Sequence, residues 1–492
     1  MSRLDETRDI RLAKLKKIVE LGYCAYPSES HRTHKTADAI SAYEELSKKT
    51  NPITLAGRIR SIRRHGGSAF VDINDLTGTI QIFISRAETG EKAYNEFAEL
   101  IDPSDLVEFS GTLFKTKQGQ ITLNAKTYNL LSKSLRNIPE AHFGLKDVET
   151  RLRKRYLDLA VNPETRQLFI KKSVFWQSLR QLMTQHDFLE VETPVLEDIP
   201  GGAEAEPFIT HHQALDRDFF LRISLELPLK RLLVGGLEKV FEIGRIFRNE
   251  GISTEHLQDY TQLEFYWAYA DYNDLMKFVQ ELYRETIKKV TGSLVITSRG
   301  HKVDWGKPWK TYDYFDEFEK NTGLKLEKVT EARLKIEAKK LGLAFEKPAG
   351  RGKLIDLIYK KKVRPKLIDP GFLVNPPVDI EPLAKRLPKE PDRVQRFQVM
   401  AYGTELGKGF SELNDPIDQR ERFEQQMKLR AAGDKEAQMI DEDYLEAMEY
   451  GLPPAAGFGL SERLFSVIMD VTAREAVLFP PMKVEDNINN NE

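Results

Sequence analysis

Between residues 53 and 132, hydrophobic and polar residues alternate with a period of two, which predicts five short strands. The turn signals Gly66-Gly67, Gly78 and Gly119 separate these strands, and a helical pattern near residues 91–100 lies between the third and the fourth. Five strands with a helix after the third is the element order of an OB-fold β-barrel, which commonly binds single-stranded nucleic acid. A small barrel without a ligand is the alternative that the pattern leaves open.

Residues 4–21 place Leu, Ile and Val at roughly helical spacing with basic residues among them, which predicts an amphipathic helix with a basic face. The basic residues are Arg8, Arg11, Lys14, Lys16 and Lys17. Such a face is either solvated or in contact with nucleic acid.

From about residue 161 onward, long helical patterns alternate with predicted strands at 239–247, 261–269 and 405–413. Hairpins or long excursions join these strands, which favours an antiparallel sheet packed by helices and therefore an α+β domain. We divide the chain into an N-terminal helical segment (1–50), the barrel (51–135), a linker (136–160), the large domain (161–487, with a Lys-rich helical insertion at about 310–365) and a tail (488–492).

The composition is that of a folded multidomain protein. Of 492 residues, 40% are hydrophobic and 30% are charged, and the net charge of −2 excludes binding by bulk positive charge in the manner of a histone. The single cysteine, Cys24, excludes an intramolecular disulfide and a zinc site built on several thiolates. Because the chain has no apolar signal region and no run of 18 apolar residues, we expect a soluble cytoplasmic protein without a membrane span.

The hairpin at residues 241–267 carries the first candidate site. Arg248 follows the first strand, where a guanidinium can bind a phosphate or a carboxylate in a bidentate manner, and Glu250 and His256 lie in the connecting loop. Glu264 and Tyr266 are two residues apart in the second strand and therefore share a face. An isolated Arg or Glu in a strand is usually part of a salt bridge, but the convergence of several polar groups on one hairpin favours a site.

Two glycine-rich segments carry further candidates. Glu405 and Glu412 would lie on opposite faces of a regular strand, but Gly407 and Gly409 permit a bulge that resets the face. Acidic side chains there suit Mg²⁺ or another cation; the alternative is a kinked edge strand with solvated acids. In GLPPAAGFGLSER, the glycines allow a ligand to approach the backbone, and Arg463 projects from a predicted strand-to-helix junction.

Two of these segments, together with a third around Pro194, resemble a known family. FRNEG with Arg248, GFGLSER with Arg463 and FLEVETPVL with Pro194 resemble, in order and spacing, the three motifs of class II aminoacyl-tRNA synthetases. The blocks LKRLLVGGLEKVFEI, WAYADYNDL, GFSELNDP and VLFPPMK narrow the resemblance to the lysyl-tRNA synthetase family. It implies an N-terminal OB-fold barrel that reads the anticodon, a catalytic domain with a six-stranded antiparallel sheet flanked by helices, and a homodimer with Pro194 in its interface.

The resemblance also implies an activity and a set of partners. ATP and L-lysine form lysyl-adenylate, and the lysyl group then passes to tRNA(Lys), with neither DNA nor a membrane involved. In the ATP site, Arg248 is expected to hold the α-phosphate and the substrate carboxylate, and Arg463 the γ-phosphate. Glu250 and His256 belong to the ATP-facing loop, and Glu405, with Glu412 beside it, is expected to bind Mg²⁺.

The remaining roles implied by the resemblance concern lysine and the anticodon. Gly202 and Glu226 are expected to receive the α-amino group, and Glu264, Tyr266 and Glu412 are expected to surround the ε-ammonium group. In the barrel, the residues expected to stack on and read the central anticodon base are Phe70, Gln81 and Arg63. The alternative for Phe70 is a core position.

Several positions depart from the family pattern, and two of them concern the metal and the amino-acid substrate. Gln398 stands where the family usually has a second metal-binding Glu, and Lys408 where an Asn near the substrate is usual. Lys408 is expected to turn toward the substrate carboxylate and phosphates rather than to pair with Glu405 or Glu412. These departures leave open a paralogue with a different amino-acid substrate. A non-catalytic tRNA-binding relative is a further alternative, and the intact Arg248, Arg463, Glu264 and Glu412 argue against it. An aspartyl or asparaginyl enzyme would need a basic group where this chain has Glu264.

Overall fold

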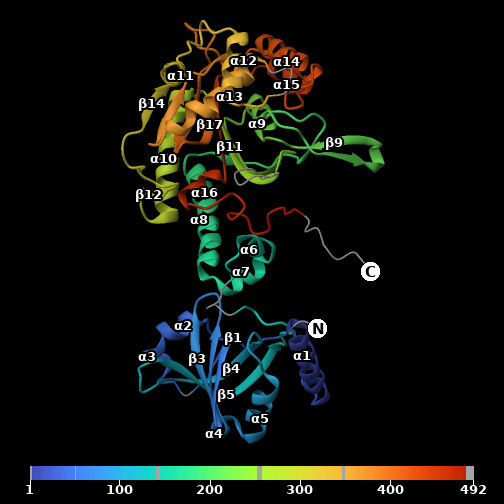
Figure 1. Cartoon of the computed structure of the whole chain (residues 1–492), viewed down its shortest axis with the longest axis vertical. Coiled ribbons are helices and arrows are strands. Elements are labelled where there is room, and N and C mark those ends of the chain that lie inside the picture. The colour runs from blue at the N-terminus through green and yellow to red at the C-terminus, as the bar shows by residue number, and fades with distance from the viewer. Residues whose placement is uncertain (1–2, 50, 140–144, 252–256, 346–349, 484–492) are drawn as a thin grey trace. The chain divides into compact units, whose positions relative to one another are not determined.

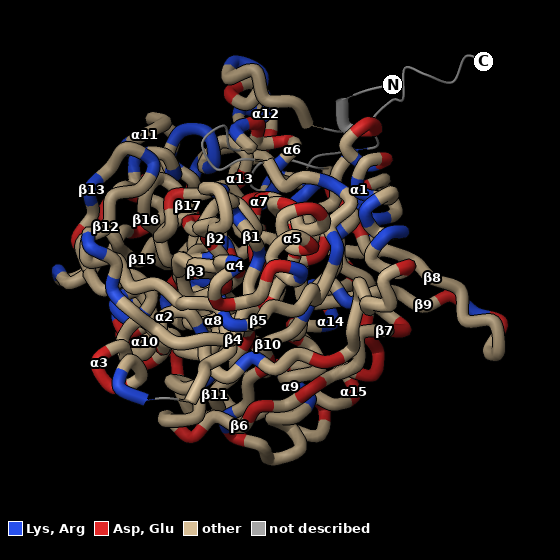
Figure 2. The backbone as a smooth tube through the Cα atoms, turned by 90° about the horizontal axis from the view of Figure 1, so that it is seen from below, with Lys and Arg blue, Asp and Glu red and all other residues tan. Residues whose placement is uncertain are grey.

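The computed structural model describes residues 3–49, 51–139, 145–251, 257–345 and 350–483, and it divides into two compact units, 1–145 and 146–492 (Figure 1). Acidic and basic residues are interspersed along both units (Figure 2), in agreement with the near-neutral net charge. No helix in the described ranges is both long and apolar enough to cross a lipid bilayer.

The N-terminal unit is a closed five-stranded barrel with the strand order β1-β2-β3-β5-β4, which confirms the predicted OB-fold. Helix α5 lies between β3 and β4, as predicted, and Phe97 of this helix is fully buried against the barrel core. The elements are α1 (Arg3–Glu20), α2 (Thr36–Ser41), α3 (Tyr43–Leu46), β1 (Ile53–His65), β2 (Ser68–Asn74), β3 (Thr79–Ser85), α4 (Arg86–Thr89), α5 (Glu91–Leu100), β4 (Leu106–Lys115) and β5 (Ile121–Ser132).

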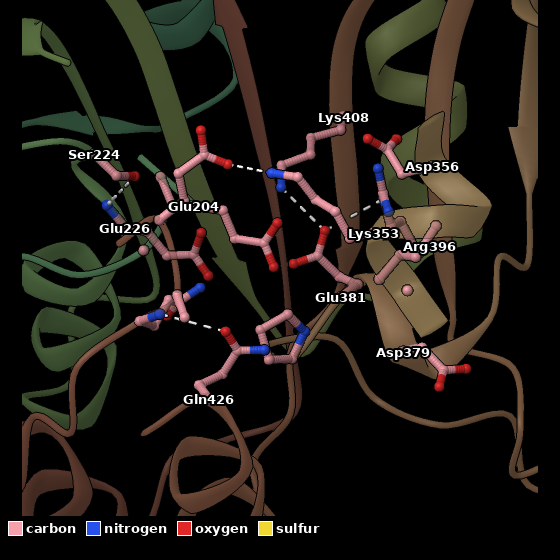
Figure 3. Close-up of a pocket in the computed structure, with 18 of the residues that line it drawn as sticks. Glu204, Ser224, Glu226, Lys353, Asp356, Asp379, Glu381, Arg396, Lys408 and Gln426 are labelled. Carbon is pink, nitrogen blue, oxygen red and sulfur yellow. Dashed lines mark hydrogen bonds and ion pairs between the residues drawn. The ribbon is translucent and has the colours of Figure 1, made fainter. Parts of the chain in front are cut away.

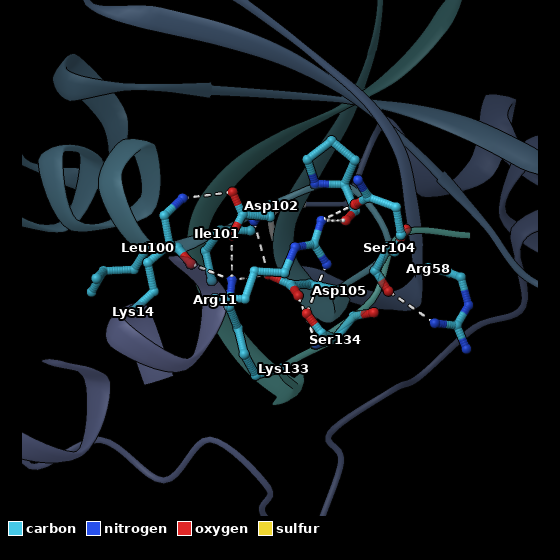
Figure 4. A network of polar contacts seen from close by, with 12 residues as sticks. Arg11, Lys14, Arg58, Leu100, Ile101, Asp102, Ser104, Asp105, Lys133 and Ser134 are labelled. Atoms are coloured by element: carbon cyan, nitrogen blue, oxygen red, sulfur yellow. Dashed lines mark hydrogen bonds and ion pairs between the residues drawn. The ribbon is translucent and has the colours of Figure 1, made fainter. Parts of the chain in front are cut away.

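Helix α1 uses part of its basic face to dock on the barrel. The Arg11 guanidinium donates to the carbonyl oxygens of Pro103 and Ser134, both at 2.7 Å, and Lys14 pairs with Asp102 at 2.6 Å. Beneath them, the fully buried Lys133 ammonium lies 2.7 Å from Asp102 and 2.8 Å from the Asp105 carboxylate (Figure 4). Arg11 and Lys14 therefore form neither a solvated face nor a contact with nucleic acid, the two predicted alternatives. Carboxylate and carbonyl oxygens of the same unit bind both side chains.

The C-terminal unit is built on an eight-stranded sheet with the order β14-β15-β16-β17-β18-β11-β10-β6. The six strands from β15 to β10 are antiparallel to their neighbours, as predicted, whereas β14 and β6 join the two edges in parallel. The parallel pair β14–β15 arises because three helices, α11 to α13, lie between these strands and return the chain to the same end of the sheet.

The elements of this unit are α6 (Val148–Arg153), α7 (Arg155–Val161), α8 (Pro163–Gln185), β6 (Leu189–Glu190), β7 (Leu196–Glu197), β8 (Ile209–His212), η1 (Gln213–Leu215), β9 (Arg217–Leu221), α9 (Glu226–Val234), β10 (Lys239–Phe247), β11 (Asp259–Ala268), α10 (Tyr272–Thr291), β12 (Val295–Ser298), β13 (His301–Asp304), β14 (Lys310–Asp313), α11 (Tyr314–Thr322), α12 (Glu331–Lys340), α13 (Arg351–Lys362), η2 (Arg364–Lys366), β15 (Gly371–Val374), η3 (Val378–Ile380), β16 (Arg396–Ala401), β17 (Thr404–Ser411), α14 (Pro416–Ala431), α15 (Glu442–Glu449), β18 (Ala455–Ser461) and α16 (Arg463–Ile468).

The two faces of the sheet have separate cores, because successive residues of a strand point to opposite sides. Phe265 of β11 packs in a core with α8 and α10, whereas its neighbour Tyr266 packs in a second core with α9 and α15. The helical insertion α11–α13 has a small core of its own. Glu264 has the same parity as Tyr266, so the predicted site lies on the α9 and α15 side of the sheet.

Candidate active site

A cavity of about 640 Å³ opens on this side of the sheet. Its floor comes from β11, β17 and β18, and its walls come from the start of α9, the segment around Gly202 and helix α13. Figure 3 shows Glu204 and Glu226 on one side of the cavity, and Lys353, Arg396 and Lys408 on the other. Of the predicted residues, Gly202, Glu226, Arg248, Glu264, Tyr266 and Glu405 all line this cavity.

The Glu264 side chain accepts hydrogen bonds from four donors. Its Oε1 accepts hydrogen bonds from Ser224 Oγ at 2.7 Å, from Gln262 Nε2 at 2.8 Å and from the Leu225 amide at 2.9 Å. Its Oε2 accepts from the Tyr266 hydroxyl at 3.0 Å, so the two residues share a face as their spacing predicted. Burial and nearby carboxylates raise the pKa of Tyr266, which keeps the phenol a neutral donor.

Gly202 is required by close packing against the α9 start. Its φ of +81° is a backbone conformation that glycine adopts without strain, and a Cβ there would lie 2.7 Å from Glu226 Cβ and 3.0 Å from Ser224 Cβ. Glu226 is the first residue of α9 and is 4% exposed. The glycine therefore allows the cavity wall to approach the Glu226 carboxylate.

Glu226 and Glu412 share a buried cation, Lys230, that the sequence analysis did not identify. The Lys230 ammonium is 2.6 Å from Glu226 Oε1 and pairs with Glu412 Oε2. Glu412 Oε1 has no hydrogen-bond partner among the described residues, and it lies beside Gly457, which lines the cavity. A buried carboxylate oxygen without a donor is suited to a positively charged ligand.

The predicted bulge in β17 is present, with Leu406 as the extra residue. Val399 pairs with Gly407 and Met400 pairs with Glu405, so Leu406 has no partner of its own. Glu405 and Lys408 consequently both line the cavity, which a regular alternation would prevent. At Gly407 a Cβ would lie 2.5 Å from the Phe458 ring, so a side chain does not fit beside the bulge.

Glu405 and Glu412 do not form a metal pair. Glu405 accepts a hydrogen bond from the Gln398 amide, whereas Glu412 pairs with Lys230. Within the described parts of the chain, no group of three or more His, Cys, Asp or Glu side chains is arranged to hold a metal ion.

Lys408 pairs with Glu381, a partner that was not predicted, and, as expected, not with Glu405 or Glu412. Its ammonium is 3.0 Å from Glu381 Oε2, and the Arg396 guanidinium is 3.4 Å from the same oxygen. Burial acts to raise the pKa of Glu381, but the charges of Lys408 and Arg396 outweigh it and lower this pKa overall. Lys408 is therefore held on the wall of the cavity, and its side chain remains 39% exposed.

Arg248 and Arg463 lie at the same end of the sheet. Arg248 directly follows β10, and Arg463 begins α16 directly after Glu462, at the end of β18; both strands flank β11. The Arg248 guanidinium donates to the Ile223 carbonyl at 3.2 Å and lies 5.8 Å from the centre of the Tyr260 ring. Burial raises the pKa of Tyr260, and the charges of Arg248 and Arg463 oppose this rise. Both guanidinium groups therefore lie close enough to Tyr260 to influence its pKa.

The connecting loop of this hairpin is described only in part. The charge of Glu250 also acts on the pKa of Tyr260, which it raises. The other predicted residue of the loop, His256, lies outside the described residues.

The barrel presents Phe70, Gln81 and Arg63 on neighbouring strands. In the strand register, Arg63 of β1 lies opposite Phe70 of β2, and Phe70 lies opposite Phe83 of β3. The ring centres of Phe70 and Phe83 are 5.1 Å apart. Gln81 is 8% exposed, and its side-chain oxygen accepts a hydrogen bond from Thr122 Oγ1 at 3.1 Å. Phe70 is only partly buried, which leaves ring area on the surface. Phe83 was not predicted, although its spacing of two from Gln81 puts it on the same face.

Known protein families match nearly the whole length of the chain. The family model described as tRNA synthetases class II (D, K and N) matches residues 147–483, and the model described as OB-fold nucleic acid binding domain matches residues 53–131. A protein of Carboxydothermus hydrogenoformans named Lysine–tRNA ligase is 45% identical over 486 residues, which cover 98% of this chain and 99% of the relative.

Two further relatives with the same name agree. The protein of Moorella thermoacetica is 45% identical over 480 residues, covering 97% of this chain and 98% of the relative. The protein of Bacillus subtilis is 41% identical over 488 residues, covering 98% of each. Together with the motif residues Arg248 and Arg463 at one end of the antiparallel part of the sheet, these matches show that the chain belongs to the lysine–tRNA ligase family of class II aminoacyl-tRNA synthetases.

Proposed function

We propose that the chain joins L-lysine to tRNA(Lys) in two steps. ATP and lysine give lysyl-adenylate and pyrophosphate, and the lysyl group then passes to the terminal ribose of the tRNA with release of AMP. The observation that carries this proposal is the acidic end of the cavity, where Glu264 is a fully hydrogen-bonded carboxylate and Glu412 Oε1 is buried without a donor.

In this proposal the substrate lies between α9 and β11. The ε-ammonium group binds near Glu264, Tyr266 and Glu412, and the α-amino group binds at Gly202 and Glu226. A neutral amino acid of the same length would leave buried carboxylates without a counter-charge, at a cost of about 2–5 kcal/mol. This difference would select lysine over uncharged analogues.

The proposed ATP site is the end of the sheet where Arg248 and Arg463 act on Tyr260. Arg248 would bind the α-phosphate and the substrate carboxylate, and Arg463 would bind the γ-phosphate; Glu250 and His256 belong to the loop beside them. The substrate carboxylate attacks the α-phosphorus, so no side chain has to remove a proton. Catalysis then depends on orientation and on neutralisation of the phosphate charge.

Mg²⁺ is the metal that we propose for this site. Glu405 and Gln398 fit it, because a carboxylate and an amide oxygen in the cavity wall suit Mg²⁺ when phosphate oxygens and water complete its ligands. When bound, the ion would neutralise charge on the ATP phosphates. Glu412 does not fit this role because Lys230 occupies it.

We assign anticodon recognition to the barrel face of Phe70, Gln81 and Arg63, with Phe83 beside them. Stacking of a base on an aromatic ring contributes about 1–3 kcal/mol, which is enough to place an anticodon base on Phe70.

A homodimer is also part of the proposal. The small sheet β7-β9-β8 follows Pro194 and exposes apolar side chains of Leu196, Ile209 and Leu215, an area that a second copy would cover. Because charged tRNA is consumed by ribosomes, we place the activity in the cytoplasm.

The paralogue with a different amino-acid substrate is not favoured. It was motivated by a second cation at the ε-ammonium site, but Lys408 is paired with Glu381 on the cavity wall.

The test is ATP–pyrophosphate exchange by the purified chain with each of the standard amino acids, followed by aminoacylation of tRNA(Lys). We expect exchange with L-lysine alone. Exchange with another amino acid in preference to lysine would support the paralogue, and binding of tRNA without any exchange would support the non-catalytic relative.

A further inference from the structure

Lys230 is the most deeply buried cation beside the proposed lysine site. It lies on α9, one helical turn after Glu226, and its side chain is 0% exposed. Its ammonium contacts the carboxylates of Glu226 and Glu412, and it lies 5.2 Å from the centre of the Phe410 ring and 5.9 Å from that of Tyr266. A buried ammonium is costly unless carboxylates compensate it, and here two do so.

The charges around the site balance only when a substrate with two positive groups is present. Glu226, Glu264 and Glu412 are 4%, 3% and 1% exposed, and Lys230 is the single ammonium in contact with any of them among the described residues. Burial raises the pKa of Glu412 well above its usual value, and the charge of Lys230 opposes this rise. When all three acids are ionised, three carboxylates and one ammonium leave two negative charges. Free lysine brings two ammonium groups, and Arg248 is available for its carboxylate.

We propose that Lys230 is a positioning residue that supplies the internal counter-charge of this site, so that the ionised forms of Glu226 and Glu412 are favoured and directed at the two ammonium groups of the substrate. This inference rests on the proposed function, because it names what sets the selectivity of that site for a dicationic amino acid.

A purely structural role makes a different prediction. A Met in place of Lys230 would keep the packing against Phe410 and Tyr266. It removes one partner of a buried ion group, however, so we expect the fold to lose stability because Glu226 and Glu412 are left uncompensated. If Lys230 only fills space, the folded Lys230→Met variant will bind lysine as the wild type does. If it supplies charge, the folded variant will bind lysine weakly.

The pH dependence separates these cases further. Burial raises the pKa of Glu226 to about 7, and the charge of Lys230 lowers it from what burial alone would give. The ionised form of Glu226 binds the substrate, so kcat/KM for lysine falls as the pH drops below this pKa. Without Lys230 the pKa of Glu226 rises, so the fall in kcat/KM for lysine begins at a higher pH. The charged and titratable groups around Glu226 and its partner are Lys230, Glu264, Lys408, Glu412 and Tyr444.

The experiment measures kcat and KM for lysine by pyrophosphate exchange between about pH 6 and 9 in the wild type, Lys230→Met and Lys230→Arg. The matched control is Lys239→Met, a partly buried lysine of the same unit that contacts Trp267 and Phe188 rather than the cavity. For Lys230→Met we expect KM at pH 7 to rise at least about tenfold, and the acid limb of kcat/KM to move up by about one pH unit or more.

Lys230→Arg should keep the wild-type position of the acid limb, because it keeps the charge, and Lys239→Met should match the wild type throughout. An unchanged KM and acid limb in Lys230→Met would overturn the proposal. A wild-type chain that does not exchange with lysine at all would instead overturn the proposed function.

A charge-compensated variant covers the case in which Lys230→Met does not fold. Lys230→Met combined with Glu226→Gln restores two negative charges, whereas Glu226→Gln alone leaves one. The double variant should therefore bind lysine at least as well as Glu226→Gln alone. A further loss of about tenfold in the double variant would refute the role of Lys230 as a counter-charge.

Discussion

Glu264→Gln removes one negative charge from the lysine site with almost no change in shape. The carboxylate accepts three hydrogen bonds on Oε1 and one, from the Tyr266 hydroxyl, on Oε2. A glutamine can place its carbonyl oxygen at the Oε1 position and keep three of the four bonds. The Tyr266 hydroxyl can then rotate and accept from the new amide, so the fold should lose only about 1 kcal/mol.

The effect on lysine binding should be much larger. A hydrogen bond to a charged group contributes about 1.5–3 kcal/mol to the free energy of binding. Two opposite unit charges about 4 Å apart attract each other by about 4 kcal/mol at an effective dielectric constant near 20. We therefore expect KM for lysine to rise about 30- to 1,000-fold, with a smaller change in KM for ATP.

The assay is pyrophosphate exchange with lysine varied at saturating ATP, and thermal melting monitors the fold. Glu285→Gln makes the same chemical change on an exposed position of α10 and should behave as the wild type does. If Glu264→Gln melts normally and its KM for lysine stays within about threefold of the wild-type value, Glu264 does not bind the ε-ammonium group.

Three further changes test the other assignments. Arg248→Ala should abolish adenylate formation because it removes a bidentate contact to phosphate; near-normal exchange would show that the motif is misassigned. Phe70→Ala should raise KM for tRNA and leave lysine exchange unchanged, since it removes a stacking surface in the separate barrel; equal loss in both assays would mark Phe70 as a core residue. Lys408→Asn should change KM for lysine by less than about tenfold, because Arg396 still pairs with the buried Glu381; a switch of the preferred amino acid would revive the paralogue.

The barrel and the central hairpin could be predicted from the sequence because a period of two fixes which side chains share a face. Glu264 and Tyr266 are the clearest case, since their spacing alone placed them together. The two parallel edge strands could not be predicted, because β6 has only two residues and β14 only four, which is too short to show a periodicity. The division of the chain into five segments stays a prediction.

Lys230 and Glu381 were missed for different reasons. Lys230 follows Glu226 by four residues, a spacing that is typical of an exposed ion pair on a helix, but the packing of α9 against β10, β11 and α15 buries it. Glu381 lies in an irregular segment after η3, where no pattern predicts burial. As a result, most acids of the site could be predicted, but neither Lys230 nor the pairing of Lys408 with Glu381 could.

The bulge at Leu406 has a consequence for how the family can vary. On one side of it lies Glu405, and on the other lie Lys408, Phe410 and Glu412, all of which serve the same cavity wall or its floor. Deleting one residue between Glu405 and Gly407 would restore a regular strand and turn Glu405 toward the opposite core. We therefore expect β17 to accept many point substitutions in evolution but almost no insertions or deletions, so that its length should be a stricter signature of the active enzyme than any single residue in it.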